Sequence, residues 1–167
     1  MRQFHLPSII LGLLLTSTAA LAQPISWANM AHVAAGGSVL QKVSGCDGCD
    51  DTGASSFETI DSGEGYVEFT VGEAGAFFLA GLSHGDDSTS YADIDYAFRF
   101  NGAGWADVLE NGVYQSGGDT PYEPGDVFRV AIFGNKIQYI RNGVVLMEHP
   151  QTVQYPVLLD VARSEEH

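Results

Sequence analysis

Two Asn-Gly dipeptides constrain the fold of this chain more than any other feature of its sequence. Asn111-Gly112 and Asn142-Gly143 each stand between short runs in which apolar and polar residues alternate. Asn and Gly tolerate the positive φ angles that both central positions of a type I′ turn require, so each dipeptide predicts a tight β-hairpin. The flanking runs are residues 105–109 and 113–115 for the first hairpin, and residues 136–140 and 144–147 for the second.

The rest of the chain also shows strand patterns, and no stretch has a helical period. Residues 66–71 and 93–100 alternate in polarity, whereas residues 76–82 are apolar on both faces, as expected for a buried central strand. About ten or more short strands joined by tight turns predict one antiparallel, all-β sandwich domain. In residues 93–100 the side chains predicted to share one face are Ile94, Tyr96, Phe98 and Phe100.

The start of the chain has the features of a secretory signal peptide. A basic residue, Arg2, precedes an apolar run at residues 6–15, and small residues follow that end in Ala20-x-Ala22. The apolar run is too short to cross a bilayer comfortably. We therefore expect cleavage after Ala22 and a secreted protein, extracellular or periplasmic, without membrane insertion.

The part predicted to remain after cleavage is one strongly acidic domain. We expect the sandwich to occupy residues 23–162 and a polar tail to occupy residues 163–167. Loss of Arg2 reduces the seven basic residues to six against 21 acidic ones, so the net charge moves from −14 to −15. Such a surface repels phosphate backbones and anionic lipid, which argues against a nucleic-acid partner.

Cys46 and Cys49 are the only cysteines, and they are separated by two residues. In an exported chain, an isolated pair of cysteines is expected to form a disulfide. A redox-active pair would need a helix after the first cysteine, and a zinc site would need further ligands nearby; the flanking residues are mostly glycine and aspartate. The small ring that this disulfide closes is expected to stabilise the domain by only about 1–2 kcal/mol.

A series of short motifs runs in a fixed order along the predicted mature chain. They are Trp27-x-Asn29, Gly37-x-Val39-Leu40-x-Lys42, Gly53-Ala54-Ser55-Ser56, Ile60-x-x-Gly63-x-Gly65-Tyr66-Val67-Glu68-Phe69, Gly81-Leu82-Ser83, Tyr91-x-Asp93-Ile94-Asp95-Tyr96-Ala97, Glu110-Asn111-Gly112, Gly125-Asp126-x-Phe128-Arg129-Val130 and Ile137-x-Tyr139-x-x-Asn142-Gly143. In this order they resemble the concanavalin A-like lectin/glucanase superfamily, in particular its small SPRY-like modules in secreted microbial proteins. The resemblance covers Ile25 to Asp160 and implies a jelly-roll β-sandwich.

The end of the chain departs from this resemblance. Modules of this kind usually finish with a strand that pairs near the N-terminal one, whereas this chain stops soon after residues 156–161. The sequence therefore leaves open whether the usual final strand is present, and the first strand is expected to expose an edge.

The resemblance also implies an enzymatic alternative. Glucanases of this superfamily carry Glu-x-Asp-x-Glu or Glu-x-Asp-x-x-Glu in one strand, where carboxylates about 5–5.5 Å apart serve as nucleophile and general acid. The nearest match here is residues 93–98, in which Ala97 or Phe98 stands where the second glutamate would be. Because this proton donor is missing, the chain is predicted not to be an enzyme, and glycoside hydrolysis is the least favoured function.

Two acidic loops offer oxygen ligands for a hard cation. One contains Asp47, Asp50 and Asp51, and the other is the segment from Asp86 to Asp93. Neither has the spacing of an EF-hand loop, and aspartate is also a common turn former whose side chain bonds nearby backbone groups. The sequence therefore predicts no metal site and no cofactor, with calcium in the segment from Asp86 to Asp93 as the alternative.

Binding remains as the favoured function. Aromatic residues in loops and hairpins, Tyr91, Trp105, Tyr114 and Tyr122, are of the kind that stack on a sugar ring, although they also suit ordinary packing. We predict a module that recognises carbohydrate or a cell-surface component, with a SPRY-like protein-interaction module or a structural adhesion module as the alternative. The candidate ligand-binding residues are Asp86, Asp87, Tyr91, Asp93 and Trp105.

Overall fold

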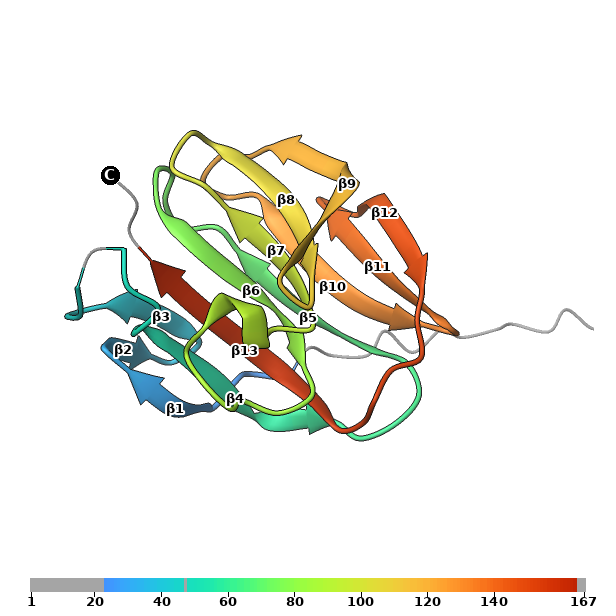
Figure 1. Cartoon of the computed structure of the whole chain (residues 1–167), viewed down its shortest axis with the longest axis horizontal. Helices are drawn as coiled ribbons and strands as arrows, with labels where there is room; N and C mark the ends of the chain where they lie inside the picture. Colours follow the sequence, from blue (N-terminus) through green and yellow to red (C-terminus); the bar gives the residue numbers. More distant parts are fainter. Residues whose placement is uncertain (1–22, 47, 165–167) are drawn as a thin grey trace, which may run out of the picture.

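Two antiparallel sheets packed face to face form the body of the molecule (Figure 1). The computed structural model describes residues 23–46 and 48–164, so the predicted signal peptide at residues 1–22 lies outside the described residues. The elements are β1 (Trp27–Ala31), β2 (Val33–Gly36), β3 (Val39–Lys42), β4 (Gly53–Ile60), β5 (Gly65–Thr70), β6 (Phe77–Ser83), the 3₁₀ helix η1 (Tyr91–Asp93), β7 (Tyr96–Phe100), β8 (Trp105–Glu110), β9 (Val113–Pro121), β10 (Val127–Phe133), β11 (Lys136–Arg141), β12 (Val144–Pro150) and β13 (Val157–Ser164).

The order of the strands confirms the predicted antiparallel sandwich. The larger sheet has the order β1-β4-β13-β6-β7-β8-β9 and the smaller one the order β12-β11-β10-β5, while β2 and β3 form a separate hairpin. Both Asn-Gly hairpins are confirmed, between β8 and β9 and between β11 and β12. Their central residues have the expected positive φ angles, 50° and 72° for Asn111 and Gly112, and 49° and 79° for Asn142 and Gly143.

The core between the two sheets is built from aromatic rings. Phe98 contacts Phe128 at a centroid distance of 4.9 Å and Tyr139 at 5.5 Å, and Phe100 contacts Phe128 at 4.8 Å. All three contacts are edge-to-face, the arrangement that adds about 0.5–1.5 kcal/mol per pair to the burial of the rings. This core fixes which face of the larger sheet points inward, and hence which side chains its outer face carries.

The final strand that the sequence left open is present. β13 lies in the middle of the larger sheet, where it pairs with β4 on one side and β6 on the other. It continues to Ser164, so the first two residues of the predicted polar tail belong to the strand. β1 is an edge strand, as expected.

One predicted face assignment is wrong. Ile94 does not share the inner face with Tyr96, Phe98 and Phe100, because η1 ends at Asp93 and the strand begins only at Tyr96. Ile94 instead packs on the outer face of the larger sheet, in a second apolar cluster with Leu79, Ala97, Leu109 and Ala162. The chain between β6 and β7 therefore folds over the outer face of this sheet.

Candidate functional site

The segment between β6 and β7, residues 84–95, covers the outer face of the larger sheet and carries most of the predicted site residues. Figure 1 shows this segment, with η1, in front of β13 and β4. Ile94 is only 1% exposed and anchors its C-terminal end. At its tip, the Thr89 hydroxyl donates a hydrogen bond to the Asp50 carbonyl, which ties it to the loop before β4.

Three aspartates meet beneath this segment. Asp86 and Asp93 come from the segment itself, and Asp160 comes from β13 in the centre of the sheet. One carboxylate oxygen from each of the three lies within 4.8 Å of the other two. Asp86 and Asp93 are partly exposed, whereas Asp160 is buried. The structure thus brings two of the predicted site residues together with a third that the sequence did not indicate.

Backbone and side-chain donors hold the two aspartates of the segment. The amides of Asp87 and Ser88 donate to Asp93 Oδ2 at 2.7 and 3.0 Å, which closes the segment on itself. Asn29 Nδ2, from β1, donates to Asp86 Oδ2 at 2.8 Å and also lies 3.2 Å from Ser55 Oγ. The positions of both carboxylates are therefore set by the protein.

Asp160 differs from these two because its carboxylate is not fully paired. The residue is 3% exposed, and its Oδ2 atom has no hydrogen-bond partner among the described residues. Burial raises the pKa of the Asp160 carboxyl to about 8; the negative charges of Asp86, Asp93 and Asp95 contribute to the increase, and a hydrogen bond from the Val161 amide opposes it. A buried carboxylate surrounded by other carboxylates is costly unless a proton or a cation neutralises it.

Small residues flank Asp160 in the larger sheet. In the sheet, Asp160 stands opposite Ser55 of β4 and Gly81 of β6. A Cβ atom on Gly81 would lie only 1.9 Å from the Tyr96 carbonyl oxygen, so this position requires glycine. Ala97, the next position across the sheet, is also small and fully buried.

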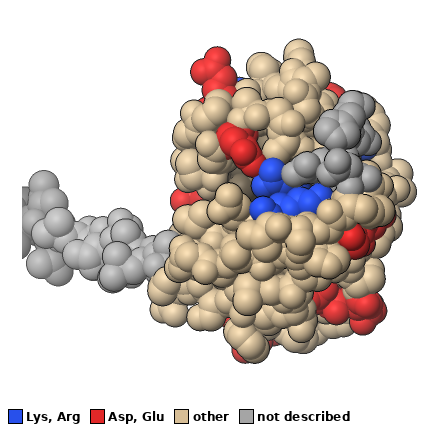
Figure 2. All heavy atoms as spheres, turned by 90° about the vertical axis from the view of Figure 1, so that its left-hand side faces the viewer, with Lys and Arg blue, Asp and Glu red and all other residues tan. Residues whose placement is uncertain are grey.

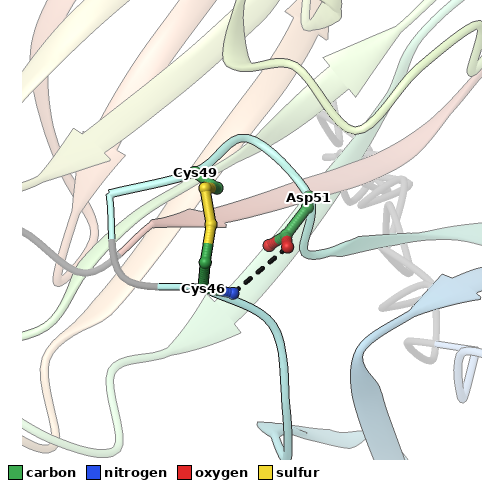
Figure 3. Close-up of side chains that lie close together, drawn as sticks. All are labelled: Cys46, Cys49 and Asp51. Carbon is green, nitrogen blue, oxygen red and sulfur yellow. Dashed lines mark hydrogen bonds between the residues drawn. A yellow bond between two sulfur atoms is a disulfide. The ribbon is translucent and has the colours of Figure 1, made fainter.

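The disulfide between Cys46 and Cys49 is confirmed, and Figure 3 shows it beside Asp51. The Cys46 amide donates to Asp51 Oδ2 at 3.2 Å and the Thr52 hydroxyl to Asp51 Oδ1 at 2.9 Å, and these bonds hold the pKa of Asp51 below its usual value. The sulfur atoms are bonded to each other, and both Asp51 carboxylate oxygens accept hydrogen bonds from the loop. Asp51 therefore acts here as a turn-forming residue. Asp47, predicted with this loop, lies outside the described residues.

The predicted aromatic residues are divided between the two ends of β8. Trp105 begins β8, whereas Tyr91 lies beside Gly112, at the hairpin that follows the other end of the strand. Tyr114 follows this hairpin directly and is paired with Leu109 of the outer-face cluster. Tyr122 is buried in the core. The structure therefore places Tyr91 and Tyr114 at one hairpin and separates Trp105 from the aspartates.

The side of the molecule shown in Figure 2 carries a basic patch, although the chain as a whole is acidic. Lys and Arg side chains gather there in one patch, with Asp and Glu side chains around it. At the end of β13, Arg163 pairs with Glu73 at 2.7 Å.

The structure contains no helix, among the described residues, that is long and apolar enough to cross a membrane.

The sequence did not indicate two participants in the site, Asp160 and Asn29. Asp160 interrupts the apolar run from Val157 to Val161, so a lone carboxylate in a central strand was an available signal. Asn29 has a positive φ angle of 46°, which nothing in its local sequence indicates. Both residues are more than 50 positions away from the segment that they contact, so only the fold brings them together.

Comparison with known proteins identifies the fold. No protein-family model and no curated protein sequence matches this chain. Its structure is similar to the carbohydrate-binding module CBM66 from Bacillus subtilis, with a TM-score of 0.52 and 13% identity over 87% of this chain and 96% of that one. Further similar structures are the PSpry domain of TRIM65 (TM-score 0.48, 10% identity, 68% and 64% covered) and a β-glucanase of Bacillus licheniformis (0.41, 12%, 66% and 57%). The likeness to CBM66 shows that the fold is a jelly-roll β-sandwich, as the sequence resemblance implied.

Proposed function

We propose that this protein is a secreted, non-catalytic carbohydrate-binding module that holds a sugar on the outer face of its larger sheet, beside the hairpin at Asn111-Gly112. The observation that carries the proposal is the pair of exposed tyrosines at this hairpin. Tyr91 is 41% exposed and Tyr114 is 47% exposed. A tyrosine ring offers an apolar face for a sugar ring together with a polar edge.

The surroundings of these tyrosines suit a polar ligand. The Tyr114 hydroxyl donates to Asp119 Oδ2 at 2.7 Å, which fixes the direction of the ring and leaves the other carboxylate oxygen for a ligand hydroxyl. Asp87 is exposed in the same segment as Tyr91. A few rigid aromatic side chains with nearby polar groups are typical of small-molecule sites.

The fold and the core support a binding role rather than hydrolysis. The structure matches the carbohydrate-binding module CBM66 over nearly the whole length of that chain. In the segment nearest to the glucanase motif, Ala97 and Phe98 are both fully buried in apolar clusters. This segment therefore has no carboxylate at the position of the second glutamate, which would act as general acid. The disulfide is compatible with the oxidising environment of a secreted protein.

Affinity electrophoresis against a panel of soluble polysaccharides tests the proposal. We expect at least one polysaccharide to retard the purified protein, and Tyr91→Ala and Tyr114→Ala each to weaken this interaction about tenfold. Trp105→Ala is the matched control, because Trp105 has a similar exposure, 50%, but lies at the other end of β8.

Two results would contradict the proposal. If no glycan binds while a protein partner is captured through the same hairpin, the module is a protein-interaction domain of the SPRY kind. If Trp105→Ala abolishes glycan binding and the tyrosine variants do not, the sugar binds at the opposite end of the sandwich.

A further inference from the structure

We propose that Asp86, Asp93 and Asp160 together bind one calcium ion, which joins the segment between β6 and β7 to the central strand β13. For a site at this segment, the sequence alone indicated ligands only from the segment itself. The structure adds a ligand from a strand more than 60 positions later, and this residue is the one that distinguishes a cation site from an acidic turn.

The buried residue carries the inference. An exposed group of aspartates needs no ligand, because water solvates each carboxylate. Asp160 is 3% exposed, and its Oδ2 atom, which has no partner among the described residues, belongs to a carboxylate that lies within 4.8 Å of two others. Buried polar atoms are nearly always paired, so an unpaired one next to two further carboxylates indicates a positively charged ligand.

The chemistry of the ligands favours calcium. The cluster contains carboxylates and neither histidine nor cysteine, which suits a hard cation and not zinc. Calcium lies about 2.3–2.6 Å from its oxygen ligands, so two oxygens on opposite sides of the ion are at most about 5 Å apart. One carboxylate oxygen from each aspartate lies within 4.8 Å of the other two, so a single ion of this kind can contact all three. Magnesium requires shorter distances, near 2.1 Å, and a stricter octahedron.

Neighbouring hydrogen bonds prepare the two other ligands for this role. Asp93 is held by the Asp87 and Ser88 amides through Oδ2, and Asp86 is held by Asn29. The Ser83 hydroxyl, at the end of β6, donates to the Asp93 carbonyl at 2.9 Å, which also fixes the Asp93 backbone. Such supporting contacts orient the ligands of a metal before it binds.

Calorimetric titration of the purified, EDTA-treated chain with calcium chloride, without any sugar, tests the proposal independently of the proposed function. We expect one ion to bind per chain, and calcium at about 100 times its Kd to raise the melting temperature by roughly 5–10 °C. Asp160→Asn, which preserves size, is expected to lower calcium affinity at least roughly 100-fold while the variant stays folded. Magnesium chloride at the same concentrations should produce a much smaller shift.

Asp87→Asn is the matched control, because Asp87 is an exposed aspartate of the same segment outside the cluster. It should bind calcium like the unchanged chain. Asp86→Asn, a change at the partly exposed ligand, provides a second variant if Asp160→Asn does not fold, and it too should lose affinity. The proposal is overturned if calcium gives neither heat nor a melting shift, if calcium binds equally well to Asp160→Asn, or if Asp86→Asn has no effect.

Discussion

Asp126 and Asp160 are both shielded aspartates of the same sandwich, yet their environments are opposite. Asp126, just before β10, accepts hydrogen bonds from Arg141 and from the Glu123 amide at Oδ2, and from Asn142 at Oδ1. These partners, the Asn142 side chain first, hold the pKa of Asp126 below its usual value. Asp160 has an unpaired oxygen, and burial raises its pKa to about 8.

The difference distinguishes a structural carboxylate from one that needs a ligand. At Asp126 the positive charge comes from Arg141 of the same chain, so this carboxylate needs no bound cation. At Asp160 the nearest charged groups are further carboxylates, so the folded domain lacks a positive charge there. The same substitution, aspartate to asparagine, should therefore have different effects on stability at Asp126 and at Asp160.

The largest expected difference concerns pH and Asp160. The folded-state pKa is raised from 3.8 to about 8, so between these values the folded protein holds a proton that the unfolded chain has released. In EDTA, stability should therefore fall as pH rises from 4 to 8, by up to about 1.4 kcal/mol per pH unit from this group. Urea unfolding of the unchanged chain and of Asp160→Asn at several pH values measures this, and the variant should become the more stable one toward pH 8. A constant difference between the two across this range would contradict the environment assigned to Asp160.

The same substitution at Asp126 should have the opposite effect. Asp126→Asn removes the charge that pairs with Arg141, a residue whose side chain is only 25% exposed, and should destabilise the domain by about 3 kcal/mol at neutral pH. The contribution of Asp126 is present above its unfolded pKa of 3.8 and is lost as pH falls through the lower folded value. Urea unfolding at pH 7 and pH 3 should therefore show a large difference from the unchanged chain at the first pH and a small one at the second. Equal stability of the two proteins at pH 7 would remove the contrast with Asp160.

The smallest expected effects come from two asparagines that share a positive φ angle. Asn142 and Asn29 have φ angles of 49° and 46°, and their side chains donate to Asp126 and Asp86 respectively. Glycine at either position preserves the backbone and removes the donor. Asn142→Gly should lower stability by about 1 kcal/mol, and Asn29→Gly should lower calcium affinity roughly tenfold. Thermal unfolding and calcium titration of both variants provide the test; a loss of calcium affinity in Asn142→Gly would show that the effect is not local.

Local chemistry explains what the sequence could predict. The type I′ hairpins at Asn111 and Asn142 depend on two adjacent residues, so the dipeptide alone indicates them. The jelly-roll fold was implied by the resemblance that a series of motifs from Trp27 to Gly143 carries, and the disulfide was predicted from the expected export of the chain and the short cysteine spacing. In each case the information lies within a few neighbouring residues or in their order.

The parts that could not be predicted depend on pairing between distant strands. Asp160 meets Asp86 only because β13 inserts between β4 and β6, and a strand pattern does not specify which strand it joins. Ile94 was assigned to the wrong face because one turn of 3₁₀ helix interrupts an otherwise regular alternation. Trp105 and Tyr91 were grouped as aromatic residues near turns, although β8 separates them.

A crystal structure of the protein grown with calcium chloride is the decisive test of the calcium site. We expect one ion, identified by its anomalous scattering, within about 2.3–2.6 Å of a carboxylate oxygen from each of Asp86, Asp93 and Asp160. A water molecule at this position in millimolar calcium, or a proton shared between Asp160 and a neighbouring carboxylate without any ion, would contradict it.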